Sequence, residues 1–228
     1  NPLTFGKHAA FNHFFQGVID DVRVYNRALS PSEIQSDMNT PVSGSNPSDP
    51  SQVGQWATPF SLPAKDIHMA LFRTGGVLFW DAFSLGHEAY MWNADGSFTY
   101  VPSADNVFCA GLTILADGNA LLVGGHAGGG VGIPDANRFN PVTKSWIPVA
   151  SMSYARWYPT ATSLPDGRVL VVSGSTTCYT CIADIPEIYN PTTNTWTQLS
   201  GAQLSMPLYP HMYVLPDGRV LYASSTEG

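Results

Sequence analysis

The sequence predicts an all-β fold in which a four-stranded unit repeats around an axis, as a partial β-propeller of about three blades. Three similar segments lead to this prediction, each with an Asp-Gly turn between two apolar stretches. The turns begin at Asp117, Asp166 and Asp217, which lie 49 and 51 residues apart. A period of about 50 residues with a hairpin turn and a buried strand is typical of propeller blades. The segments are residues 114–123, 163–172 and 214–223.

Composition excludes two classes of partner. The chain has 228 residues and is 44% hydrophobic, enough for packed cores. Its 10 basic and 17 acidic residues give a net charge of -7, which offers no attraction for nucleic-acid phosphates or anionic lipid. No apolar run approaches the ~20 residues that a membrane span needs. We therefore expect neither nucleic-acid binding nor a membrane span.

The residue content favours an extracellular protein. Only 12% of the residues are charged, and there are 21 Gly and 18 Pro, which is typical of secreted all-β proteins. Residues 1–12 lack the charged-then-apolar pattern of a signal peptide. Because the chain begins at Asn1 rather than Met, we expect it to be part of a longer, secreted protein.

The first 39 residues have a predicted strand and helix pattern that differs from the repeats that follow. Residues 11–15 and the alternation of Val22 and Val24 with charged neighbours predict strands. Residues 30–33, Ser-Pro-Ser-Glu, predict a helix with a capping box. The run GVIDDVRVYNRALSPSEI resembles the last strand and closing helix of laminin-G-like, concanavalin-type jelly rolls. This resemblance implies that residues 1–39 are the C-terminal end of such a domain.

Residues 40–54 predict a linker, because Ser, Pro, Gly, Asn and Asp dominate them without periodicity. Residues 55–228 are then expected to form the first blades of a truncated propeller. Asn-Pro turns at Asn140 and Asn190 lead to Trp146 and Trp196, and residues 67–80 and 90–101 form a first blade without this signature. The period, the aromatic spacing and the double glycine at residues 124–125 resemble kelch repeats, which by themselves imply a fold and no activity.

Three residues share one position in the repeat. Cys109, Tyr158 and Tyr209 each precede an Asp-Gly turn by eight residues. We expect this position on the first strand of each blade, nearest the axis. Cys109 and Tyr158 would then be neighbours although they lie 49 positions apart in the sequence.

The runs NVFCAG and ARWYPT, residues 106–111 and 155–160, resemble the start of the catalytic propeller of the galactose oxidase and glyoxal oxidase family of copper radical enzymes. The resemblance implies that a thioether joins Cys109 to Tyr158, and that Tyr158 is both a copper ligand and the radical site. Copper(II) accepts one electron, whereas oxidising an alcohol or aldehyde removes two, so the tyrosine supplies the second redox site. The family's second tyrosine and two histidine ligands come from later sequence, and for Tyr209 we expect a place lining the channel.

One departure from the family concerns the tryptophan that covers the thioether. It is expected after the glycine at the end of the second blade strand, where this chain has Thr176. Tyr179 or Trp157 could replace it.

The remaining candidates have structural interpretations. Cys178 and Cys181 predict a local disulfide, because a zinc site would need a second ligand pair. The histidines at 87, 126 and 211 show no ligand spacing, and residues 124–130 lack the Lys-Ser/Thr ending of a phosphate loop.

The resemblance therefore implies that the chain is part of a secreted copper radical oxidase that acts on carbohydrate-related primary alcohols or aldehydes and reduces O2 to H2O2. The chain alone would carry one copper ligand and be inactive. The alternatives are a non-catalytic kelch and laminin-G module for carbohydrate binding or adhesion, and a surface protein that has lost the activity. Without the family match, Cys109, Tyr158 and Tyr209 would be structural core residues.

Overall fold

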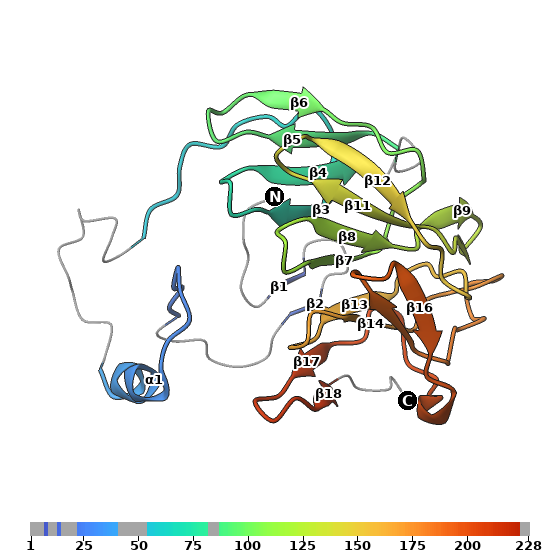
Figure 1. Cartoon of the computed structure of the whole chain (residues 1–228). Coiled ribbons are helices and arrows are strands. Elements are labelled where there is room, and N and C mark those ends of the chain that lie inside the picture. Colours follow the sequence, from blue (N-terminus) through green and yellow to red (C-terminus); the bar gives the residue numbers. More distant parts are fainter. Residues whose placement is uncertain (1–6, 9–12, 15–21, 41–53, 82–86, 224–228) are drawn as a thin grey trace. The chain divides into compact units, whose positions relative to one another are not determined.

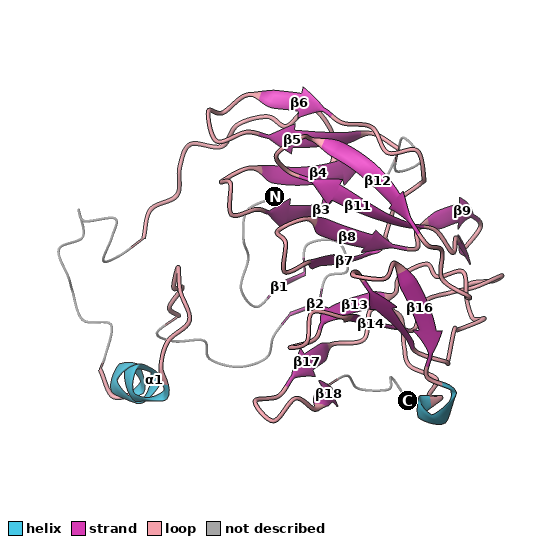
Figure 2. Cartoon of the chain, in the orientation of Figure 1, coloured by secondary structure: helices cyan, strands magenta, loops and turns pink. Residues whose placement is uncertain are grey.

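Antiparallel strands make up nearly all of the regular structure, so the predicted all-β class is confirmed (Figures 1 and 2). The structure is a computed structural model and describes residues 7–8, 13–14, 22–40, 54–81 and 87–223. The chain divides into two units, residues 1–60 and 61–228. Within the described residues, no helix has the length and apolar character that crossing a membrane requires.

The first unit contains helix α1 (Pro31–Met38) and a short ladder of β1 (Lys7–His8) with β2 (His13–Phe14). The predicted capping box is present, since Ser30 Oγ accepts from the Glu33 N–H at 3.3 Å and Glu33 Oε2 accepts from the Ser30 N–H at 2.7 Å. The strand expected at Val22 and Val24 is wrong: both side chains are exposed, and no described strand pairs with them. Of the strand expected at residues 11–15, residues 13–14 form β2, and the rest of it lies outside the described residues, as does most of the predicted linker.

Three four-stranded antiparallel sheets and one hairpin follow in sequence order in the second unit (Figure 1). The first sheet is β3 (Asp66–Leu71), β4 (Val77–Asp81), β5 (Ala89–Trp92) and β6 (Phe98–Tyr100). The second is β7 (Gly111–Ile114), β8 (Ala120–Val123), β11 (Ala136–Asn140) and β12 (Ser145–Val149). The third is β13 (Thr160–Ser163), β14 (Val169–Val172), β15 (Glu187–Asn190) and β16 (Thr195–Gln198). The last hairpin is β17 (Met212–Val214) with β18 (Val220–Tyr222).

Two minor elements complete the regular structure of the described part of this unit. Strands β9 (His126–Gly128) and β10 (Val131–Gly132) form a small hairpin between β8 and β11. A single 3-10 turn, η1 (Ser200–Ala202), follows β16.

The Asp-Gly turns have one geometry in all three repeats. Gly118, Gly167 and Gly218 have φ angles of 86°, 85° and 84°, in the left-handed region that glycine adopts without strain. In each turn the Asp Oδ1 accepts a hydrogen bond from the N–H two residues later, at 3.0 Å. The sequence period is thus a structural period.

The core lies between successive sheets. One apolar cluster joins the first and second sheets, a second joins the second and third, and a third joins the third sheet to the last hairpin. The second strand of each complete repeat is covered on both faces, and β8 and β14 are buried along their whole length. Face-to-face packing of this kind explains why residues 169–172 are apolar without alternation.

The repeated tryptophans link each sheet to the one before it. The Trp146 indole N–H donates to the Val101 carbonyl at 2.7 Å, and the Trp196 indole N–H donates to the Ala150 carbonyl at 2.6 Å. Each donor is also packed against an aromatic ring of its own sheet, Phe139 or Tyr189. This satisfied polar end explains why the repeat uses Trp at a half-buried position.

Candidate functional site

The turn segments that precede β7, β13 and β17 share an unusual backbone. Cys109, Tyr158 and Tyr209 have φ angles of 56°, 64° and 49°. Residues other than glycine rarely adopt this region, and each such residue costs on the order of 1–3 kcal/mol. The three residues are structural equivalents, but they lie in turns just before the inner strands, and the expected position on the strands is wrong.

Backbone hydrogen bonds place the three segments side by side. The Tyr158 N–H donates to the Cys109 carbonyl at 3.1 Å, and the Tyr209 N–H donates to the Tyr158 carbonyl at 2.9 Å. Each bond therefore connects one repeat to the next. The rings of Tyr158 and Tyr209 are 4.8 Å apart between centroids.

Cys109 is a buried free thiol, 2% exposed, with polar contacts to Tyr158, Tyr209 and Trp157. Burial raises the pKa of the thiol to about 11, and these contacts oppose the rise. Burial, followed by the contact with Cys109, raises the pKa of the Tyr158 phenol. Both groups are therefore neutral at pH 7. A neutral thiol is a poor nucleophile, so the pair is suited to oxidative coupling rather than thiolate attack.

Trp157 covers Tyr158. Their rings stack at 4.2 Å with an interplanar angle of 22°, and His126 stacks on the other side of Trp157 at 4.4 Å. Tyr179 meets Trp157 edge-on at 6.0 Å. Of the two residues that the sequence offered as a cover, Trp157 is therefore the one that stacks on the tyrosine.

Segment 156–158 is held by the third sheet. Trp157 and Ser175 exchange backbone hydrogen bonds of 2.9 and 2.7 Å. The Arg156 guanidinium is fully buried and pairs with Glu187 at 3.0 Å. It also donates to the carbonyls of Ser173 and Ile185, both at 2.7 Å. These contacts fix the backbone from which Trp157 and Tyr158 project.

His68 is a site residue that sequence reasoning missed. Its Nε2 lies 3.2 Å from the Tyr209 hydroxyl, although 141 residues separate the two in sequence. A signal existed: His68 precedes the turn glycine Gly75 by seven residues, as Gly111 and Thr160 precede Gly118 and Gly167. It therefore occupies the position at which the inner strands β7 and β13 begin.

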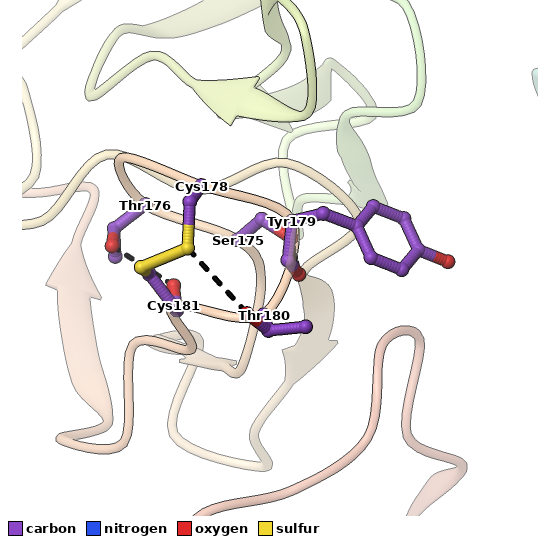
Figure 3. The surroundings of a disulfide bond; sticks show 6 residues. All are labelled: Ser175, Thr176, Cys178, Tyr179, Thr180 and Cys181. Carbon is purple, nitrogen blue, oxygen red and sulfur yellow. Dashed lines mark hydrogen bonds between the residues drawn. A yellow bond between two sulfur atoms is a disulfide. The ribbon is translucent and has the colours of Figure 1, made fainter.

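Cys178 and Cys181 form a disulfide with an S–S distance of 2.11 Å (Figure 3). Side chains tie the loop to the strand end before it, since Ser175 Oγ donates to the Tyr179 carbonyl at 2.8 Å and Thr176 Oγ1 donates to the Cys181 carbonyl at 2.9 Å. The Tyr179 ring points away from the disulfide, and 57% of the residue is exposed (Figure 3).

We expect the double variant Cys178→Ser/Cys181→Ser to lower the free energy of unfolding by about 2 kcal/mol, because the cross-link closes a very short loop in the unfolded chain. Urea denaturation checks this, with Cys109→Ser as the variant that keeps the disulfide. A loss above about 4 kcal/mol would show that the loop contributes packing that these contacts do not explain.

The donor atoms of the site fit copper in part. Phenol oxygen and imidazole nitrogen are both ligands that copper(II) accepts. Tyr158 is the residue that matches the family motif. Among the described residues, no group of three or more His, Cys, Asp or Glu side chains converges on a possible metal position. A complete copper site therefore needs ligands beyond those seen here.

Comparison with known proteins links both units to known families. Residues 1–35 match a laminin G family model described as Concanavalin A-like lectin/glucanases superfamily. Galactose oxidase of Gibberella zeae is 26% identical over 170 residues, which are 67% of this chain and 24% of that protein. A WSC domain-containing protein of Arthroderma benhamiae is 31% identical over 134 residues, 54% of this chain and 14% of that protein.

A solved structure shows the same fold. It is described as a novel fungal alcohol oxidase of the AA5 family in complex with copper, and it matches with a TM-score of 0.56 and 24% identity. The match covers 66% of this chain and 34% of that one. The chain thus spans about a quarter of galactose oxidase and a third of the alcohol oxidase. Over most of its length the chain resembles galactose oxidase and its copper-containing relatives, and at its start it resembles the laminin-G-like family.

Proposed function

We propose that this chain is part of a secreted copper radical oxidase, in which Cys109 and Tyr158 form a thioether-linked radical site. The parent protein would oxidise primary alcohols or aldehydes related to carbohydrates and reduce O2 to H2O2. Residues 55–228 would form the N-terminal blades of a kelch propeller, after a jelly-roll end at residues 1–39 and a linker at residues 40–54. The adjacency of the Cys109 thiol and the Tyr158 phenol is the observation that carries the proposal.

The chemistry of the cross-link follows from the neutral state of both groups. The Cys109 S–H and one ring C–H of Tyr158 are lost, an S–C bond forms, and two electrons and two protons pass to O2 to give H2O2. Copper, held by the Tyr158 oxygen and by ligands from elsewhere in the protein, would supply one-electron redox chemistry beside the modified tyrosine. Sulfur substitution makes the phenol easier to oxidise, which suits Tyr158 to hold the second oxidising equivalent.

The surrounding residues protect such a site. Trp157 lies flat on the Tyr158 ring at 4.2 Å and keeps water from that face. Arg156, Glu187 and the Ser175 backbone hold the segment rigid. Rigid support of this kind keeps a reactive side chain in one position.

Peptide mapping of the intact protein after exposure to copper(II) and air tests the proposal. We expect one cross-linked peptide pair containing Cys109 and Tyr158, lighter by two hydrogen atoms than the sum of the free peptides. Cys109→Ser and Tyr158→Phe should each abolish it, and Tyr179→Phe should leave it unchanged. Recovery of only unlinked peptides from the copper-treated protein would refute the thioether.

A second candidate function is carbohydrate binding or adhesion without catalysis. The match of residues 1–35 to the lectin and glucanase superfamily favours it. Under this proposal the parent protein would bind glycans but produce no copper-dependent peroxide, and an oxidase assay on alcohols and aldehydes separates the two functions.

A further inference from the structure

Tyr209 and His68 form a half-buried phenol–imidazole pair next to the proposed radical site. The Tyr209 hydroxyl lies 3.2 Å from His68 Nε2 and 3.4 Å from the Ala110 carbonyl. When the His68 ring carries its proton on Nδ1, Nε2 is free to accept the phenol proton, and it is the nearer of these two acceptors. The Tyr209 hydroxyl also has a polar contact with the Cys109 thiol, so the pair borders the proposed thioether without being part of it.

The surroundings of His68 keep its ring in a fixed place. It stacks on Trp80 with ring centroids 5.4 Å apart and an angle of 20°. Trp80 is fully buried, and its indole N–H donates to the Val107 carbonyl at 2.9 Å. The imidazole is therefore oriented by a rigid neighbour.

Burial also keeps His68 neutral. Desolvation lowers the pKa of its imidazole, so Nε2 can accept a proton at pH 7. No carboxylate that would hold the imidazolium form makes an ion pair with it among the described residues.

Removal of an electron from a phenol makes its O–H group strongly acidic, so oxidation is fast only where an acceptor for the proton is already in place. The Tyr209 hydroxyl has such an acceptor in His68 Nε2. Tyr209 also lies beside Tyr158, at 4.8 Å between ring centroids, close enough to exchange an electron with it.

We propose that Tyr209 is a second oxidisable tyrosine of this protein and that His68 is its proton acceptor. An electron passes from Tyr209 to a one-electron oxidant, which is an oxidised Tyr158 or an outer-sphere metal complex. The proton moves from Tyr209 Oη to His68 Nε2 in the same step. The products are a neutral tyrosyl radical, an imidazolium and the reduced oxidant. The pair needs neither copper nor the thioether, so it goes beyond the proposed function.

The probe is hexachloroiridate(IV), a one-electron oxidant, mixed with the 228-residue chain and freeze-quenched for electron paramagnetic resonance. We expect a long-lived tyrosyl signal from the half-buried Tyr209 ring, because fully exposed tyrosyl radicals are lost by coupling between molecules. Tyr209→Phe should remove this signal. Tyr213→Phe, which changes an exposed tyrosine on β17, should leave it, and Tyr158→Phe should leave it as well.

The role of His68 is tested by two variants. His68→Leu removes the acceptor, whereas His68→Gln keeps a hydrogen-bonding group of similar size that is not a base. Both should slow formation of the signal by about a hundredfold, the lower range for a positioned proton acceptor. The parent chain should also react more slowly in D2O.

Three results would overturn the inference: no long-lived signal in the parent chain, a signal that persists in Tyr209→Phe, or parental rates in the folded His68→Gln chain. The last would show that His68 only positions the phenol. Peptide mapping of Cys109 and Tyr158 reports on the thioether separately. A missing cross-link together with an intact Tyr209 signal would refute the proposed function and leave this inference standing.

Discussion

Replacement of Arg156 by Met is expected to lower the free energy of unfolding by about 3–5 kcal/mol. Arg156 and Glu187 are both fully buried and are joined at 3.0 Å. The other Glu187 oxygen, Oε1, accepts from the Ser153 N–H at 2.7 Å. Without the guanidinium, the carboxylate would stay buried with its charge uncompensated. Urea denaturation followed by tryptophan fluorescence measures the loss.

Two controls separate this effect from a general cost of losing an arginine. Arg168→Met removes the exposed pair with Asp166, and we expect a loss of less than about 1 kcal/mol. The double variant Arg156→Met/Glu187→Leu removes both buried charges and should regain much of the stability. A single Arg156→Met variant within about 1 kcal/mol of the parent chain would show that the pair contributes little.

The repeat could be predicted because its signals are local. An Asp-Gly turn needs an acceptor side chain and a residue at positive φ. The Asp supplies the first and the adjacent Gly supplies the second, so the turn can be recognised from neighbouring residues. The buried strands were predictable from runs such as residues 169–172, which are apolar throughout. The register of Cys109, Tyr158 and Tyr209 followed from counting back to these turns.

What the sequence does not reveal depends on contacts between distant segments. The left-handed backbone of Cys109 and Tyr158 has no signature, because tertiary hydrogen bonds between repeats stabilise it. The choice of Trp157 over Tyr179 as the stacking ring depends on how Ser175 pairs with residue 157. His68 was missed because its partner is 141 residues away. The strand expected at Val22 and Val24 was wrong because the prediction used only the local pattern. Alternation without a described partner strand does not make a sheet.

Three glycines of the second and third repeats have a role that composition does not show. A Cβ atom at Gly124 would lie 2.1 Å from the Arg156 carbonyl oxygen, and one at Gly132 would lie 2.5 Å from the Arg156 carbonyl carbon. One at Gly174 would lie 2.9 Å from the Arg156 Cβ. Three glycines from different strand ends therefore surround the residue that precedes Trp157 and Tyr158. Their missing side chains make room for the backbone that carries the site.

We therefore expect Gly124→Ala to cost about 3 kcal/mol or more, because a left-handed alanine is strained and its methyl group overlaps backbone rather than a side chain that can rotate away. The Arg156 carbonyl cannot retreat freely, since it accepts from the Gly125 N–H at 3.0 Å.

Gly167→Ala is the matched control: its φ is 85°, against 72° at Gly124, and no atom lies within 4 Å of the new methyl group, so only the backbone strain of about 1–2 kcal/mol remains. The difference between the two variants isolates the steric overlap. Because a displaced Arg156 also moves Trp157, Gly124→Ala should change the near-ultraviolet circular dichroism of the aromatic stack, whereas Gly167→Ala should not. Equal stability losses in the two variants would mean that segment 156–158 can shift to admit a methyl group, and the rigid support assigned to the Cys109 and Tyr158 site would then be wrong.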